Sequence, residues 1–413
     1  MASENYQQGG VQARLSDFLD AYGLGVLFAA NVFGAGSVYI LADTGANFAF
    51  ALLWVLPLAF LIDIALHDMS ARLAVSREPL TDYIVDLLPG PSGPLLIVSM
   101  AMMSALWSIA NYAIAGAALA WLVPGLDNVI IGILLASGVG IALVELRVYE
   151  RIEGAIAAMV ITVFGSYGLL LVGLDIPVGD VAAGLIPVLQ SEIGYLTAVI
   201  ALLGTTVYWP NFFIQSSMGP TKEWSNISTY RRDNAAGIVT TLTIGAFVMI
   251  VSAVTLTEGP TTLTGPGEPL AAILGDSALY IFLFAALLAS FSSATGTLFG
   301  AGYMVPQAFG HHTRFGDAKF RATVVGLIIF SAIAAFWLLA NTGLTPVRMA
   351  IIMPAINGLI ALPITVLALI GAVNRYRDVS TKENIAFALV ALVLLIGSVT
   401  TAESLAATIS GWL

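Results

Sequence analysis

Few polar side chains lie inside the long apolar stretches of this chain, and each of them is a candidate for chemistry. Asp63 is the clearest case. A carboxylate within an apolar helix can carry a proton or bind a cation, or it can pair with a hydroxyl, an amide or an arginine near the end of the helix. Carboxylates are costly and rare in lipid, and this rarity favours a functional role for Asp63.

Two other stretches contain residues that interrupt a helix. Glycines or a proline there break the ladder of backbone hydrogen bonds, which is costly in lipid unless the freed groups line a cavity. Such breaks in two spans indicate a common solvated chamber with a substrate site. The structural alternative is a glycine packing contact and an ordinary proline kink. The predicted substrate site contains Gly34, Ala35, Gly36, Ser37, Tyr208, Trp209, Pro210 and Asn211, together with Asp63.

The remaining polar residues of the apolar stretches are candidates for a coupling site or for support of the substrate site. Amides in such helices more often hydrogen-bond to another helix than bind a substrate. Tyr208 and Trp209 form either an aromatic wall for an organic substrate or a cation, or a plug that fills space. The candidates of this supporting group are Asn31, Asn111, Gln215, Ser292, Ser293 and Asn357.

The composition identifies the solvent of these helices. Hydrophobic residues make up 59% of the 413 residues and charged residues 10%, and the mean hydropathy is +0.94. Only lipid accommodates helices that are apolar on every side. The net charge of -10 argues against a nucleic-acid partner. There are no cysteines, and His67, His311 and His312 are expected near helix ends or in loops.

The apolar runs and the loop charges together predict an all-α membrane protein with about eleven transmembrane helices. Every lysine and arginine except Arg348 then falls on one side of the membrane, as the positive-inside rule requires for an inside amino terminus. We expect the protein in the plasma membrane of the cell, with its carboxyl terminus outside. The predicted spans are 19–43, 46–74, 93–122, 127–146, 152–174, 190–220, 233–256, 273–305, 320–341, 344–372 and 383–410.

The breaks in the first and sixth spans predict an inverted five-plus-five repeat within a single transporter domain, residues 1–413. The first repeat covers about 19–174 and the second about 190–372, followed by an additional helix at about 383–410. Residues 1–18 are polar and lack the pattern of a signal peptide, so we expect a cytoplasmic tail.

Several short motifs occur in one order along most of the chain. They are Gly23-Leu24-Gly25, Ala51-Leu52-Leu53-Trp54-Val55-Leu56, Ser70-Ala71-Arg72-Leu73, Tyr149-Glu150-Arg151-Ile152-Glu153, Gly204-Thr205-Thr206-Val207, Ser292-Ser293-Ala294-Thr295-Gly296-Thr297 and Leu362-Pro363. Through them the sequence resembles the Nramp-type divalent metal transporters. The resemblance implies a LeuT-like bundle of ten helices plus an eleventh, and transport of a divalent metal ion.

The motifs that carry metal binding in that family differ here. The family's Asp-Pro-Gly-Asn falls on Gly34 to Ser37, and its Met-Pro-His falls on Tyr208 to Pro210, followed by a retained Asn211. The family's acidic residues of helix three fall near Ala110 and Ala113, and a histidine of helix six falls on Gln215. Because these replacements are neutral, the remodelled site suits a cation that keeps part of its water shell.

The sequence therefore predicts a secondary-active transporter that moves a divalent metal cation by alternating access. It contains no Walker A loop, no dinucleotide fingerprint and no zinc-protease motif, so we expect neither an enzyme nor a bound cofactor. The expected partners are membrane lipid and a small cation or solute. Two alternatives stay open: a carrier of a small organic solute held by Tyr208, Trp209 and Asn211, and a non-transporting sensor or partner of another membrane protein.

Overall fold

The computed structural model describes residues 23–145, 165, 167–222, 224, 226–377 and 379–412. The predicted tail 1–18, most of the predicted span 152–174 and the motif from Tyr149 to Glu153 lie outside the described residues.

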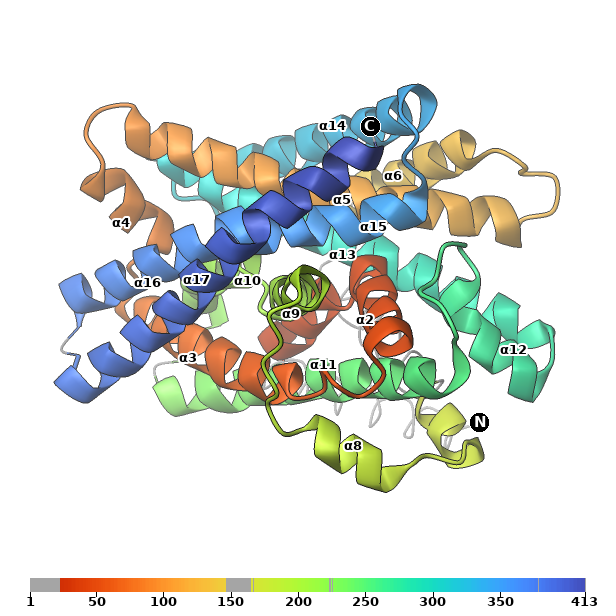
Figure 1. Cartoon of the computed structure of the whole chain (residues 1–413). Helices are drawn as coiled ribbons and strands as arrows, with labels where there is room; N and C mark the ends of the chain where they lie inside the picture. The colour runs from red at the N-terminus through yellow and green to blue at the C-terminus, as the bar shows by residue number, and fades with distance from the viewer. Residues whose placement is uncertain are drawn as a thin grey trace, which may run out of the picture.

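In the described part of the chain, all regular secondary structure is helical and there is no strand (Figure 1). This confirms the predicted all-α class. A helical segment Gly23–Val32 comes first. It is followed by α2 (Ala35–Phe48), α3 (Val55–Ser76), α4 (Leu80–Leu87), α5 (Ser92–Leu122), α6 (Val129–Glu145), α8 (Val178–Gly184), α9 (Ile193–Thr206), α10 (Pro210–Met218), η1 (Gly219–Lys222), α11 (Ile227–Thr255), η2 (Gly265–Gly267), α12 (Glu268–Leu274), α13 (Ser277–Ala308), α14 (Ala318–Asn341), α15 (Pro346–Ile356), η3 (Asn357–Ala361), α16 (Leu362–Tyr376) and α17 (Thr381–Trp412).

Among the described residues, seven helices are long and apolar enough to cross a membrane, or up to eight if one bent pair counts as a span. The chain is therefore an integral membrane protein, and the count of eleven spans stays a prediction. The helix α6 is apolar but shorter, and α3 carries Asp63, Asp68 and Arg72 along its length.

Two spans are interrupted where the sequence predicts it. The segment Gly23–Val32 and the helix that continues from Gly36 to Phe48 meet at an angle of 58°. In the sixth span, α9 ends at Thr206 and α10 begins at Pro210, with Val207 in an extended conformation. A third irregularity was not predicted: a π-helix, η3, joins α15 to α16.

The interrupted spans lie at the centre of the molecule. Figure 1 shows α2 and α9 between α11 on one side and α5, α13 and α15 on the other. The long helices α5 and α13 pack along each other over most of their length, and α10 packs against both α3 and α13. The two breaks are therefore enclosed by other helices and do not face lipid.

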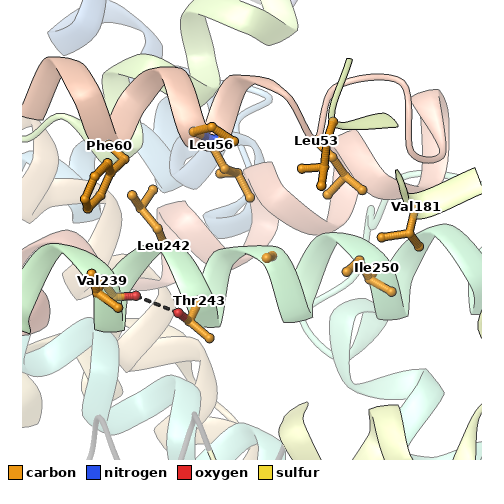
Figure 2. Close-up of a pocket in the computed structure, with 11 residues that line it drawn as sticks. Leu53, Leu56, Phe60, Val181, Val239, Leu242, Thr243 and Ile250 are labelled. Atoms are coloured by element: carbon orange, nitrogen blue, oxygen red, sulfur yellow. Dashed lines mark hydrogen bonds between the residues drawn. The ribbon is translucent and has the colours of Figure 1, made fainter. Parts of the chain in front are cut away.

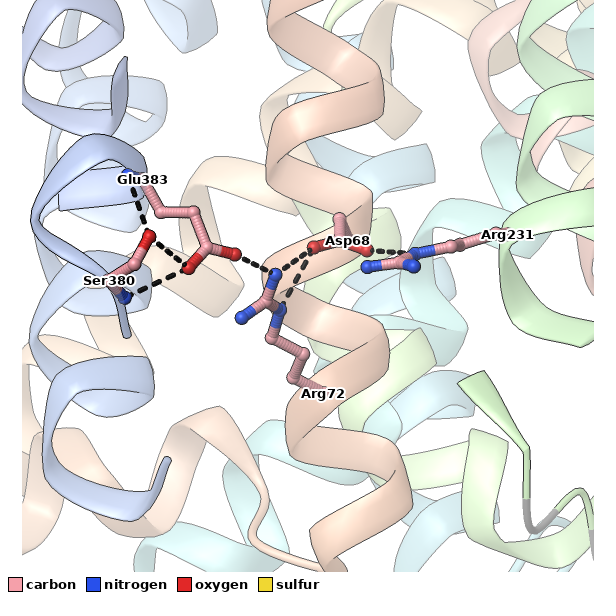
Figure 3. Close-up of polar contacts among 5 residues, drawn as sticks. All are labelled: Asp68, Arg72, Arg231, Ser380 and Glu383. Carbon is pink, nitrogen blue, oxygen red and sulfur yellow. Dashed lines mark hydrogen bonds and ion pairs between the residues drawn. The ribbon is translucent and has the colours of Figure 1, made fainter. Parts of the chain in front are cut away.

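A network of charged side chains ties together the ends of three helices that are distant in sequence (Figure 3). Arg72 of α3 donates to Asp68 at 2.9 Å and to Glu383 of α17 at 2.5 Å. Asp68 also accepts from Arg231 of α11 at 2.6 Å. Glu383 is held in turn by the N–H and hydroxyl groups of Ser380. Because Arg72 and Asp68 are mostly buried, this network is less screened than an exposed ion pair.

The helices α9 and η3 approach so closely that only glycine fits between them. A Cβ atom on Gly204 would lie 2.7 Å from the Cα atom of Gly358, whereas a Cβ atom on Gly194 of the same helix would meet nothing within 4 Å. We expect Gly204→Ala to lower the free energy of unfolding by about 1–3 kcal/mol, because backbone atoms must move apart. Gly194→Ala is the matched control and should be neutral or slightly stabilising. Denaturation in detergent measures both, and equal effects would contradict this packing.

Arg72→Met should lower the thermal unfolding midpoint, because it leaves two carboxylates without the guanidinium that they share. The difference from the wild type should shrink when salt is raised, since salt screens the charges that remain. Arg375→Met is the control, because Arg375 binds a single carboxylate, that of Asp86, at 3.4 Å with both side chains about half exposed. An equal effect of the two variants would show that the network adds nothing beyond one surface pair.

Candidate functional site

The break in the first span leaves backbone carbonyl groups without their helical partners. In a continuous helix, the carbonyl oxygens of Asn31 and Val32 would accept from the N–H groups four residues later. Here the hydroxyl of Ser293 donates to the carbonyl oxygen of Asn31 at 2.6 Å, and the hydroxyl of Ser37 donates to that of Val32. Ser37 also lies 2.7 Å from the hydroxyl of Thr205, so it joins the break in the first span to α9.

The two breaks meet through a pair of amides. Asn31 donates through its Nδ2 to the Oδ1 of Asn211 at 3.0 Å, and Asn211 donates to the carbonyl oxygen of Phe28 at 3.3 Å. Both asparagines are buried. The Oδ1 atom of Asn31 has no hydrogen-bond partner among the described residues and lies against Gly296, where a Cβ atom would stand 2.1 Å from it. An unpaired buried amide oxygen is a ready ligand for a cation.

Helices α5 and α13 close the other side of this break. The indole N–H of Trp107 donates to the Oγ of Ser293 at 2.8 Å, and Asn111 donates to the backbone of its own helix at Trp107. A Cβ atom on Gly34 would lie 2.6 Å from both the Oδ1 of Asn111 and the Oγ of Ser293. Gly34 therefore lets the chain pass directly beside these polar groups.

The aromatic residues of the second break point to other helices. Tyr208 donates to the hydroxyl of Thr297 on α13 at 2.6 Å and contacts the ring of Trp107, with centroids 4.7 Å apart. Trp209 donates to the Oδ1 of Asn357 at 3.1 Å, at the start of the π-helix. Pro210 is the first residue of α10. Both rings are fully buried and both polar atoms are hydrogen-bonded, so in this conformation they fill space between helices.

Other predicted residues lie apart from the breaks. Ser292 donates to a carbonyl of its own helix at Ala289. Gln215 lies one turn beyond Asn211 on α10, and its Oε1 atom is 2.9 Å from the Nδ1 of His67. Asp63 is buried on α3, one turn before His67.

The expectation that His67 lies near a helix end or in a loop is wrong. This side chain is only 2% exposed, inside α3, because the helix continues to Ser76. The i, i+4 spacing from Asp63 was the signal in the sequence that could have brought the two residues together.

The candidate site is therefore built of neutral groups. Among the described residues, no three side chains of histidine, aspartate or glutamate gather where they could hold a metal ion. The donors at the breaks are the amides of Asn31 and Asn211, the hydroxyls of Ser37 and Ser293, and backbone carbonyls. Neutral oxygen ligands suit a hard cation such as Mg²⁺, Ca²⁺ or Mn²⁺ better than a soft one.

A groove on α3 and α11 has a different character (Figure 2). It encloses about 480 Å³ and is lined by apolar side chains such as Leu56, Phe60 and Leu242, together with Thr243. The hydroxyl of Thr243 donates to the carbonyl of Val239 in its own helix, so it offers no free donor. The side chains that line this groove therefore offer no ligand for a cation.

Solved structures share the fold of this chain. The manganese transporter of Eremococcus coleocola superimposes with a TM-score of 0.75 over 95% of this chain and 88% of its own, at 18% identity. The transporter MhsT, solved with L-phenylalanine, superimposes with a TM-score of 0.58 over 92% of this chain and 98% of its own, at 15% identity. These likenesses confirm the predicted LeuT-like fold.

Comparison at the level of sequence gives the family. A divalent metal cation transporter, MntH of Acidiphilium cryptum, is 28% identical over 353 residues, which cover 79% of this chain and 76% of the relative. MntH of Xanthomonas campestris pv. campestris is 25% identical over 330 residues, or 72% and 70% of the two chains. The family model described as natural resistance-associated macrophage protein-like (Nramp) matches residues 25–407. The chain thus belongs to the Nramp family.

Proposed function

We propose that this protein is a secondary-active transporter that moves a divalent metal cation across the plasma membrane by alternating access. The observation that carries the proposal is the direct contact of the two helix breaks through Asn31 and Asn211, in a chain that matches the family over nearly its whole length. In transporters with discontinuous helices, unwound carbonyls at such a junction coordinate ions. The relatives that are divalent metal cation transporters support the class of substrate.

The ligands would be the oxygens now held by side-chain donors. The carbonyls of Asn31 and Val32 accept from Ser293 and Ser37, and the amide oxygen of Asn31 is unpaired. A cation that enters the junction replaces these hydroxyl donors, while the hydroxyl oxygens remain available as ligands. Because no carboxylate adds charge to this set, the cation keeps several water molecules, as Mg²⁺ usually does in proteins. The remodelled site therefore favours a hard, hydrated divalent ion.

A small organic solute is the second candidate substrate. The absence of an acidic or histidine cluster among the described residues favours it, because a neutral junction does not compensate the charge of a dehydrated metal ion. Trp107 and Tyr208 would offer aromatic surface to such a solute, and Asn211 would offer an amide.

Uptake into vesicles that contain the purified chain tests the proposal. We expect uptake of Mn²⁺ or Mg²⁺ by the wild type and at least a tenfold loss in Asn211→Ala, a factor that corresponds to about 1.4 kcal/mol of binding energy. This substitution removes the partner of Asn31 and frees the carbonyl of Phe28.

The matched control is Asn374→Ala, which removes an exposed amide at the far end of α16 and should leave uptake unchanged. A thermal-shift screen against metal ions and small solutes accompanies the assay, because any ligand of the folded state raises the unfolding midpoint. Stabilisation by an organic solute, with no response to any metal ion, would contradict the proposed metal substrate and favour the organic solute.

A further inference from the structure

We propose that Asp63 and His67 form a proton-binding pair inside the helix bundle, linked through Gln215 to the junction of the two breaks. The proposal rests on the function proposed above, since it gives the transporter a site for a coupling proton. The pair stands apart from the breaks themselves and takes up one proton from water, which changes its net charge from -1 to zero.

Hydrogen bonds fix the state of the imidazole. The Nε2 of Gln215 donates to the Oδ1 of Asn234 at 2.8 Å, so the Oε1 of Gln215 faces His67. An amide oxygen only accepts, and the Nδ1 of His67 must therefore carry a proton. The other ring nitrogen, Nε2, is left as an acceptor and lies 3.7 Å from the Oδ1 of Asp63.

The Nε2 of His67 and the Oδ1 of Asp63 are placed to share one proton. The side chains of Asp63 and His67 are only 8% and 2% exposed, and the Oδ1 of Asp63 makes no hydrogen bond to any described residue. A bare carboxylate in such a place would be costly. A single proton removes this cost whether it resides on Asp63 or on His67, because the pair then has no net charge. A small closure of the 3.7 Å gap makes the hydrogen bond between the two groups.

Among the described residues, the two segments whose rings contact the imidazole supply no charge to balance Asp63. The segment Gly23–Val32 and α10 contain no ionisable residue, and their rings of Phe28 and Phe212 lie 5.0 and 4.8 Å from the imidazole.

The ionisable groups of the other helices packed on α3 are engaged elsewhere or lie at helix ends. On α11, Asp233 accepts from the backbone of Gly25 and Arg231 binds Asp68, which also binds Arg72 within α3. The hydroxyl of Tyr195 on α9 donates to the carbonyl of Val188. Tyr230 and Arg232 are in the first two turns of α11. The remaining groups are Arg375 and Tyr376 at the end of α16, where the guanidinium lies over the ring, and Lys222 in η1.

The pair is connected to the junction by one turn of α10. Asn211 and Gln215 stand four residues apart and so lie on the same face of that helix. Asn211 binds Asn31 at the break, and Gln215 binds His67. A shift of α10 on cation binding must therefore alter the hydrogen bond that sets the imidazole tautomer. This connection provides the coupling between the cation and the proton.

The thermal unfolding of purified full-length protein tests the pair without any transport. In addition to the proton on the Nδ1 of His67, the folded wild type holds one proton shared by the pair, whereas the folded Asp63→Asn variant keeps a neutral imidazole and holds no such additional proton. Model values near 3.9 for aspartate and 6.5 for histidine apply to both unfolded chains. By linkage, the midpoint of Asp63→Asn minus that of a control must rise steadily as the pH is raised from 5 to 9. The control is Asp180→Asn, which removes an exposed carboxylate on α8.

A difference that stays constant over this range would overturn the proposal. If, in addition, Mn²⁺ raised the midpoint of the control and not that of Asp63→Asn, the pair would be a metal site. Asp63→Leu serves if the amide variant does not fold, because an apolar side chain is often tolerated in place of a buried charge. Vesicles in which the wild type transports neither Mn²⁺ nor Mg²⁺ would refute the proposed function. The unfolding curves would still show whether Asp63 and His67 share a proton.

Discussion

The central constraint on this molecule is that backbone groups released inside lipid must find partners within the protein. The break after Val32 frees carbonyl oxygens at the centre of the helix bundle. Hydroxyls from Ser37 and Ser293 satisfy them, and Asn211 adds a third donor at Phe28. These donors come from α2, α13 and α10, so the break depends on the packing of these three helices around it.

These partners also explain how the backbone at the break of the first span is stabilised. The capping donors at the break are neutral side chains of modest strength, each worth about 1 kcal/mol net. A cation that binds here takes the place of the hydroxyl donors, and the carbonyl oxygens that it meets already point inward. Glycine at positions 34 and 296 keeps the approach open, because a Cβ atom at either place would collide with Asn111, Ser293 or Asn31. At the first break, the carbonyl groups are thus covered by hydrogen bonds that an ion can replace.

The sequence predicts the breaks well, because glycine and proline act locally on the backbone. It also predicts that Asn31, Asn211 and Ser293 lie within the membrane. It does not predict which of two adjacent serines faces the break: Ser293 does, while Ser292 bonds within its own helix. That choice depends on the rotation of α13 against α5, which is set by packing. The ion pair between Arg72 and Glu383 is beyond sequence reasoning for the same reason, since 311 residues separate its partners.

Two kinds of contact hold the central helices, and their difference bears on motion. The polar chain from His67 through Gln215 to Asn234 joins α3, α10 and α11, and Asp233 joins α11 to the first segment at Gly25. These bonds tie the four segments into one unit. Other hydrogen bonds join this unit and the second break to α13 and η3: from Ser293 to the carbonyl of Asn31, from Tyr208 to Thr297, and from Trp209 to Asn357. Because these bonds cross from the interrupted spans to α13 and η3, beside the site, a rigid-body movement that opens the site along that surface is expected to break them.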